Sequence, residues 1–107
     1  MPDQKVILST TYSVEGYRIV RYLDMEMAYV DYLGIKKQAK ALNVDFKREQ
    51  VIVAFEILRE KMKKIAQEKG CNGVLGVQFK ALPIGHRRDP SEGRYAMYGT
   101  LVKLEKD

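Results

Sequence analysis

The feature that most constrains this chain is the stretch from Asp45 to Val77, which has the pattern of one long amphipathic helix, a Gly-Cys-Asn-Gly turn and a strand. Its apolar residues recur at the i, i+3, i+4, i+7 spacing that places side chains on one helical face. They are Val51, Ala54, Phe55, Leu58, Met62, Ile65 and Ala66. Asp45 suits the N-cap, and Gly70 suits the left-handed position that ends a helix. We therefore predict one long helix between these two residues.

Four other segments have the composition or alternation of β-strands. They are a short run from Val6 that ends near Tyr12, and the segments 17–30, 73–82 and 94–104. The second is a long strand with room for a bulge, and simple alternation places Tyr22 on the opposite side from Met25 and Met27. The lysine-rich connection 35–44 has the pattern of a short helical turn, with Ile35, Ala39 and Leu42 on one face. The predicted element order is thus β-β-α-β-β.

Length and composition predict one globular domain spanning residues 1–107. The chain is 46% hydrophobic and 31% charged, which is enough apolar material for one core. No apolar run approaches the ~20 residues that a membrane helix needs, and residues 1–5 do not have the apolar core of a signal peptide. A single cysteine fits a reducing compartment. We therefore expect a cytoplasmic protein that does not contact membranes.

One helix covers only one face of a small sheet, and this leaves apolar side chains on the other face. Both sides of the second and fourth strands carry large apolar groups, among them Val20, Tyr22, Tyr95, Met97 and Tyr98. An exposed patch of that size exceeds what monomers usually tolerate. We therefore predict a homo-oligomer closed by symmetry.

Several runs resemble the YbjQ-like family, an uncharacterised group described as heavy-metal-binding. They are Ser9-Thr10-Thr11, Glu15-Gly16, Ile19-Val20-Arg21-Tyr22-Leu23, Gly70-Cys71-Asn72-Gly73-Val74-Leu75-Gly76-Val77 and Tyr98-Gly99-Thr100-Leu101-Val102. The resemblance implies an α+β fold: a two-layer subunit similar to that of dodecin, with an antiparallel sheet of about four strands and one long helix. It also implies assembly into a homo-oligomeric ring, typically a pentamer. Asp24 departs from the family pattern, which favours glycine there.

A heavy-metal site needs soft ligands such as thiolate or imidazole. This chain has one cysteine, Cys71, and one histidine, His86. The ordinary interpretation is a packed thiol and a solvated loop histidine, and a ring that gathers one such residue from each subunit is the alternative. An oxygen site built on Asp24, Glu26 and Asp31 is a further alternative, although these carboxylates can equally meet solvent or pair with arginines. A metal ion is therefore one candidate cofactor.

The sequence contains no catalytic constellation, so we expect a binding protein and not an enzyme. The leading hypothesis is a small ligand or metal ion bound at subunit interfaces, where clefts and convergent polar groups occur. The candidate residues combine hydroxyls, one acid and one guanidinium within the family-like runs; they are Thr10, Thr11, Glu15, Arg21 and Tyr22. The competing interpretation is that they only complete strand ends and interfaces.

A nucleic-acid-binding module is the alternative from another class. The sequence pI is 9.3, and cations gather on the predicted helix and the segment before it: Lys36, Lys37, Lys40, Lys47, Arg48, Lys63 and Lys64. Glutamates interleave with these cations and aromatic stacking residues are absent from the strip, which favours an ordinary solvated face. A purely structural or interaction ring is the remaining alternative.

Overall fold

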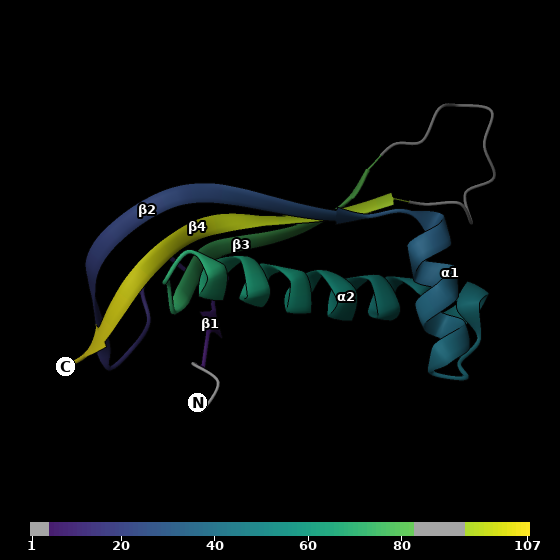
Figure 1. Ribbon diagram of the computed structural model, residues 1–107, viewed down its shortest axis with the longest axis horizontal. Helices are drawn as coiled ribbons and strands as arrows, with labels where there is room; N and C mark the ends of the chain where they lie inside the picture. Colours follow the sequence, from purple (N-terminus) through teal and green to yellow (C-terminus); the bar gives the residue numbers. More distant parts are fainter. Residues whose placement is uncertain (1–4, 83–93) are drawn as a thin grey trace.

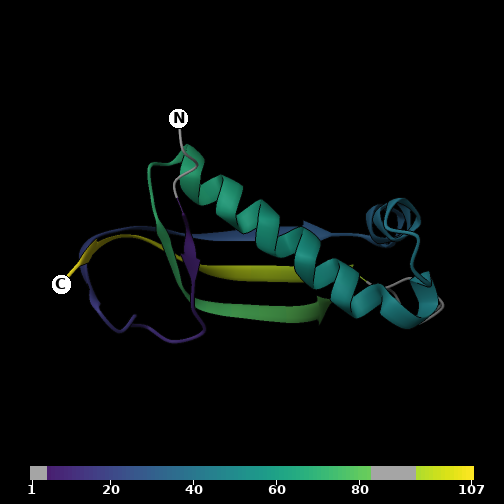
Figure 2. The same cartoon turned by 90° about the horizontal axis from the view of Figure 1, so that it is seen from below.

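The four strands and two helices of this α+β fold form two layers. The computed structural model describes residues 5–82 and 94–107. The elements are β1 (Ile7–Leu8), β2 (Tyr17–Val30), α1 (Tyr32–Ala41), α2 (Phe46–Glu68), β3 (Gly73–Leu82) and β4 (Arg94–Lys106). In the sheet they lie in the order β1-β3-β4-β2. Helix α2 runs beneath one face and crosses the strands obliquely, and α1 lies beyond one end of the sheet (Figures 1 and 2). The α+β class and the four strands are confirmed.

The sheet is mixed, so the prediction of an antiparallel sheet was wrong for one strand. β1 runs parallel to β3, with Ile7 opposite Gly73, whereas β3–β4 and β4–β2 are antiparallel. The parallel pairing continues past β1, because Val77 N–H donates to the Ser9 carbonyl at 2.9 Å. Parallel strands need a long crossover, which β2 and both helices supply here. Side-chain alternation carries no information on strand direction, and this explains the error.

Helix α1 is a second helix where only a helical turn was predicted. The Asp31 side chain caps it by accepting a hydrogen bond from Gly34 N–H at 2.9 Å. Ile35 and Ala39 are buried against the rest of the protein, but Leu42, which was expected on the same face, is 54% exposed at the C-cap. The prediction of a single helix was therefore wrong.

The ends of α2 follow the predicted caps. Asp45 Oδ1 accepts from Arg48 N–H at 3.4 Å in the first turn. Gly70 has φ +74°, Cys71 N–H donates to the Ala66 carbonyl at 2.8 Å, and Gly70 N–H donates to the Gln67 carbonyl at 3.1 Å. These two bonds form a Schellman motif, which satisfies carbonyls that the helix end leaves without partners.

The buried face of α2 differs slightly from the predicted stripe. Ala54, Leu58, Met62 and Ala66 are buried as expected, but Val53 is also buried although it lies off the predicted stripe. Val51 is 51% exposed and Phe55 is 41% exposed. Val53 lies beside Gln38 and Leu42 in the groove between the helices, because α1 packs along that side of α2. Packing of the unpredicted helix α1 against α2 thus adds Val53 to the buried side of α2.

Irregular pairing in β2 changes which of its side chains share a sheet face. The register with β4 shifts between Ile19 and Arg21 and again between Tyr22 and Met25. Tyr22 pairs with Val102 and Met25 pairs with Thr100, two β4 residues that lie on the same face. The bulges therefore place Tyr22 on the face of Met25 and Met27, against the prediction from simple alternation.

Candidate functional site

The segment between β1 and β2 holds three of the predicted ligand residues, Thr10, Thr11 and Glu15, and all three are exposed. Thr11 Oγ1 donates to the Ser13 carbonyl at 2.6 Å and lies 2.6 Å from Ser9 Oγ. Because a threonine hydroxyl has one proton, Ser9 is the donor in the second contact. Ser9 and Thr11 therefore use their hydroxyl protons to hold the loop in shape, and Thr10 does not share in this chain of bonds.

Thr10 lines a cavity of about 180 Å³ between this segment, β3, β4 and α2. Val77, Phe79 and Met97 supply apolar walls from the sheet, and Phe55 and Arg59 approach from α2. The rings of Phe55 and Phe79 meet edge to face, with centroids 5.4 Å apart and an interplanar angle of 82°. The cavity thus combines an apolar aromatic interior with one guanidinium.

Sequence reasoning missed Phe55 and Arg59 as candidate site residues. Phe55 was assigned to the core stripe, and Arg59 was not singled out. The available signal was their i, i+4 spacing, which places an aromatic ring and a cation as neighbours on one helical face. What the spacing does not reveal is that the segment after β1 packs beside them.

Close contact between Gly76 and Tyr12 anchors that segment to β3. Gly76 has φ +62°, and a Cβ added there would lie 2.5 Å from Tyr12 Cε1. Gly76 N–H also donates to the Thr11 carbonyl at 2.8 Å. Glycine is therefore required both by the backbone conformation and by the ring above it. This anchor helps to hold Ser9 and Thr10, which line the cavity, in place.

Arg21 and Tyr22 do not join Thr10 in this cavity. They are consecutive residues that pair with Lys103 and Val102, so their side chains lie on opposite faces of the sheet. Tyr22 lies on the face away from α2. Glu15 is likewise outside the cavity lining. Within one subunit, the five predicted ligand residues therefore do not form one site, and of the five it is Thr10 that lines this cavity.

Apolar side chains are exposed both on the sheet and on the helices. The sheet patch lies on the face away from α2 and consists of Tyr22, Met25, Met27 and Tyr29. Further exposed apolar side chains belong to the two helices: Leu33 in α1, Leu42 at its C-cap, and Val51 and Ile52 in the first half of α2, which together we call the helix patch. Every one of these eight side chains is more than half exposed. The predicted exposure of apolar groups on the open sheet face is confirmed for Tyr22, whereas Tyr95 and Met97 are buried on the α2 side. Val20, which lies in the first register shift of β2, is 45% exposed.

The outer edge of β2 is partly covered near its C-terminal end. Lys61 Nζ of α2 donates to the Tyr29 carbonyl at 3.1 Å. Lys61 and Tyr29 line a groove of about 380 Å³ between the strand and α2, together with Lys64 and Glu68. An edge carbonyl bound by a lysine is not available to an added strand, so this end of β2 is protected from edge pairing.

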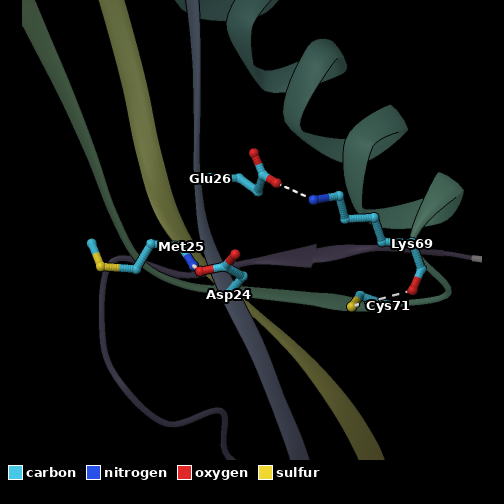
Figure 3. Close-up of polar contacts among 5 residues, drawn as sticks. All are labelled: Asp24, Met25, Glu26, Lys69 and Cys71. Carbon is cyan, nitrogen blue, oxygen red and sulfur yellow. Dashed lines mark hydrogen bonds and ion pairs between the residues drawn. The ribbon is translucent and has the colours of Figure 1, made fainter.

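The carboxylates predicted for an oxygen site have other partners. Glu26 forms an ion pair with Lys69 at the C-terminal end of α2, and Asp24 accepts from its own neighbour, Met25 N–H, at 2.8 Å (Figure 3). The hydrogen bond with Glu26 raises the pKa of Lys69. Asp31 caps α1. Within residues 5–82 and 94–107, no three His, Cys, Asp or Glu residues are grouped so that they could hold a metal ion.

Cys71 is fully buried in the main core, as the packed-thiol interpretation expects. Its Sγ lies 3.9 Å from the Lys69 carbonyl oxygen, which Figure 3 shows at the end of α2. Burial raises the pKa of the Cys71 thiol, and Lys103 and Arg21 oppose that shift only in part. The thiolate that a soft metal needs is therefore disfavoured within one folded subunit. His86, the other predicted soft ligand, lies outside the described residues.

We expect native Cys71 to react with 5,5′-dithiobis(2-nitrobenzoic acid) at pH 8 at least ~100-fold more slowly than in urea, because the reagent needs an accessible thiolate. Absorbance of the released thionitrobenzoate gives both rates. Free cysteine in the same urea solution controls for the effect of the denaturant on the reagent. Equal rates in the native and unfolded protein would contradict the buried position.

Cations of the predicted nucleic-acid strip have partners on the helices. Arg48 lies 3.7 Å from Glu49, Lys63 lies 3.7 Å from Glu60, and Lys36 lies over the Tyr32 ring at 5.8 Å. Such exposed pairs are weak and do not prevent phosphate binding. The nucleic-acid alternative stays a prediction, with no feature of the described residues that favours it over a solvated face.

No family model matches this sequence, and none of the curated proteins matches it. Among solved structures, the chain is similar to a 2.73 Å crystal structure from Pediococcus pentosaceus ATCC 25745, a protein of unknown function that belongs to the DUF74 family. The two share 14% sequence identity over 95% of this chain and 98% of the other, with a TM-score of 0.46. Neither helix in the described part of the chain is long and apolar enough to cross a membrane.

Proposed function

We propose that this protein is a homo-oligomeric binding protein of the YbjQ-like type, whose subunits form a ring by joining the sheet patch of one copy to the helix patch of the next. The observation that supports this proposal is the exposure of large apolar side chains on both layers of one small subunit. A monomer of this size rarely leaves such surfaces open to water. The proposed role is binding of a small ligand in the cytoplasm, without catalysis.

The position of the two patches favours a ring over a two-fold dimer. The sheet patch lies on the layer opposite α2, whereas the helix patch includes the first half of α2 itself. A contact between two different surfaces is heterologous, and heterologous contacts close into rings when the rotation between neighbours permits. The Lys61 hydrogen bond to Tyr29 also favours contact through the open face over pairing of strand edges. A pentamer, as in the resembling family and with a dodecin-like subunit, is the ring size we propose.

We expect native mass spectrometry of the wild-type protein to give one multimer, and the Met27→Glu variant to give mainly monomer at the same concentration. A carboxylate in the centre of an apolar contact is desolvated without a partner, which costs several kcal/mol at every interface of the ring. Ser13→Glu introduces the same charge on an exposed loop outside both patches and should leave the multimer intact. A monomeric wild-type protein would contradict the proposal.

The pairing between patches has its own test. Adding Ile52→Lys to Met27→Glu places opposite charges across every contact between a sheet patch and a helix patch, so the double variant should regain part of the multimer. A two-fold contact between sheet patches would place glutamates together and show no recovery. The same spectra, recorded without chelator, report any bound metal or ligand as excess mass and so test the metal hypothesis for Cys71 and His86.

A further inference from the structure

We infer that the cavity between Thr10 and Arg59 binds a small aromatic carboxylate, with the ring among the apolar walls and the carboxylate on the guanidinium. This inference rests on the ligand-binding part of the proposed function and not on the ring, because all residues that line the cavity belong to one subunit. It identifies the ligand by three observations: the size of the cavity, the character of its walls and the position of its one charge.

The cavity size selects a ligand with about one ring. A volume of about 180 Å³ is slightly larger than the ~150 Å³ apolar cavity that holds benzene, and it is well below the ~300 Å³ at which drug-sized sites begin. Nucleotides and other multi-ring molecules therefore exceed the space. A benzoate-sized molecule fills it and leaves its charged group at the opening.

The walls favour a planar apolar group. Phe79 stands between two other aromatic rings: it meets Phe55 edge to face at 5.4 Å and stacks on Tyr95 at 5.5 Å. Phe79 and Phe55 both line the cavity, so a ligand ring meets aromatic faces and edges there. Phe55 is 41% exposed, which leaves an entrance on the α2 side. Burial of its ring by a ligand would remove apolar surface from water.

Arg59 is the charged residue among those that line the cavity. Its Nη1 lies 3.6 Å from Glu56 Oε2, and this exposed pair occupies only part of a group with five N–H donors. In the described part of the chain the Thr10 hydroxyl has no hydrogen-bond partner, whereas Ser9 donates to Thr11. One guanidinium and one uncommitted hydroxyl match the acceptor oxygens of one carboxylate. The lining contains no Asp, Glu, His or Cys that would favour a cation.

The test is a titration of the ¹⁵N-labelled protein with benzoate, followed by two-dimensional NMR of backbone amides and arginine Nε–H groups. We expect saturable shifts at Thr10, Val77 and the Arg59 side chain, with a dissociation constant on the order of 1 mM or tighter. Benzyl alcohol, which keeps the ring, and acetate, which keeps the charge, should each bind at least ~10-fold more weakly. Equal affinity for benzoate and benzyl alcohol would overturn the assignment of the charge to Arg59.

Variants locate the site. Arg59→Met keeps an unbranched side chain and a good helix former but removes the charge, and it should weaken benzoate binding at least ~10-fold. Thr10→Val removes the hydroxyl at nearly constant shape and should weaken binding about threefold or more. Arg48→Met removes an arginine of α2 that lies outside the cavity and should leave the affinity unchanged. Similar losses from both arginine variants would indicate only general attraction of an anion and would overturn the site.

Different results would contradict the proposed ring and the proposed ligand site. Native mass spectra of the Arg59→Met and Thr10→Val variants should show the wild-type multimer, because neither residue belongs to the two patches. Met27→Glu should retain benzoate binding within about twofold, since Met27 does not line the cavity. Loss of binding in the monomeric Met27→Glu variant would show that the cavity needs a neighbouring subunit and would overturn the one-subunit site.

Discussion

Replacing Leu58 by alanine should lower the free energy of unfolding by about 2–5 kcal/mol, the usual cost of truncating a fully buried leucine. Leu58 lies near the middle of α2, is 0% exposed and belongs to the main core cluster between this helix and the sheet. Its truncation removes apolar contacts and leaves a cavity that the surrounding rigid elements fill only in part. Urea unfolding followed by far-ultraviolet circular dichroism measures the loss.

An exposed leucine serves as the control, because its replacement shows how much stability is lost when any leucine becomes alanine. Leu33 lies on α1 and is 67% exposed, so Leu33→Ala should change stability by no more than ~0.5 kcal/mol. Because Leu33 belongs to the helix patch, both substitutions are best compared in the Met27→Glu background, where assembly does not add to stability. A loss below ~1 kcal/mol for Leu58→Ala would mean that α2 does not depend on this packing.

The helix α2 and strand β3 were predictable because local residues specify them. Asp45 and Gly70 mark the helix ends through hydrogen bonds within a few residues, and apolar spacing specifies which side is buried. The parallel direction of β1 was not predictable, since it depends on pairing with β3 across more than sixty residues. The bulges that place Tyr22 beside Met25 on the open face were also missed, because β4 and not β2 alone determines the register.

The candidate site was predictable only in part for the same reason. Thr10 was singled out from a family-like run, but the cavity that it lines exists because the segment after β1 packs against β3 and α2. Phe55 and Arg59 lie about fifty residues further along the chain, and helical periodicity assigned the ring to the core. An aromatic residue with an arginine one turn later is the local pattern that such a site leaves in the sequence, and the 41% exposure of Phe55 becomes visible only in the structure.

Asn72 in the Gly-Cys-Asn-Gly turn should be as sensitive to substitution as a core residue. Its side chain forms the pair of hydrogen bonds that the backbone of a neighbouring strand would form: Oδ1 accepts from Leu104 N–H at 2.7 Å, and Nδ2 donates to the Leu104 carbonyl at 3.0 Å. Its own carbonyl accepts from Ile7 N–H at 3.0 Å, so one residue joins the start of β3 to β4 and β1. Asn72→Ala should lower the free energy of unfolding by about 2–4 kcal/mol, because both Leu104 groups lose partners in a half-buried position.

A second substitution at the same position tests this mechanism through its pH dependence. In the Asn72→Asp variant, an ionised carboxylate still accepts from Leu104 N–H but places its second oxygen against the Leu104 carbonyl, and only the protonated acid donates there. The folded state thus raises the pKa of the introduced carboxyl above its unfolded value of ~3.9. Its stabilising bond is fully present below that unfolded pKa and is lost as the pH rises through the folded pKa. Urea unfolding of both variants from pH 3.5 to 7 should therefore show Asn72→Asp gaining stability relative to Asn72→Ala as the pH falls. A constant difference between them would show that the Nδ2 bond to Leu104 contributes little.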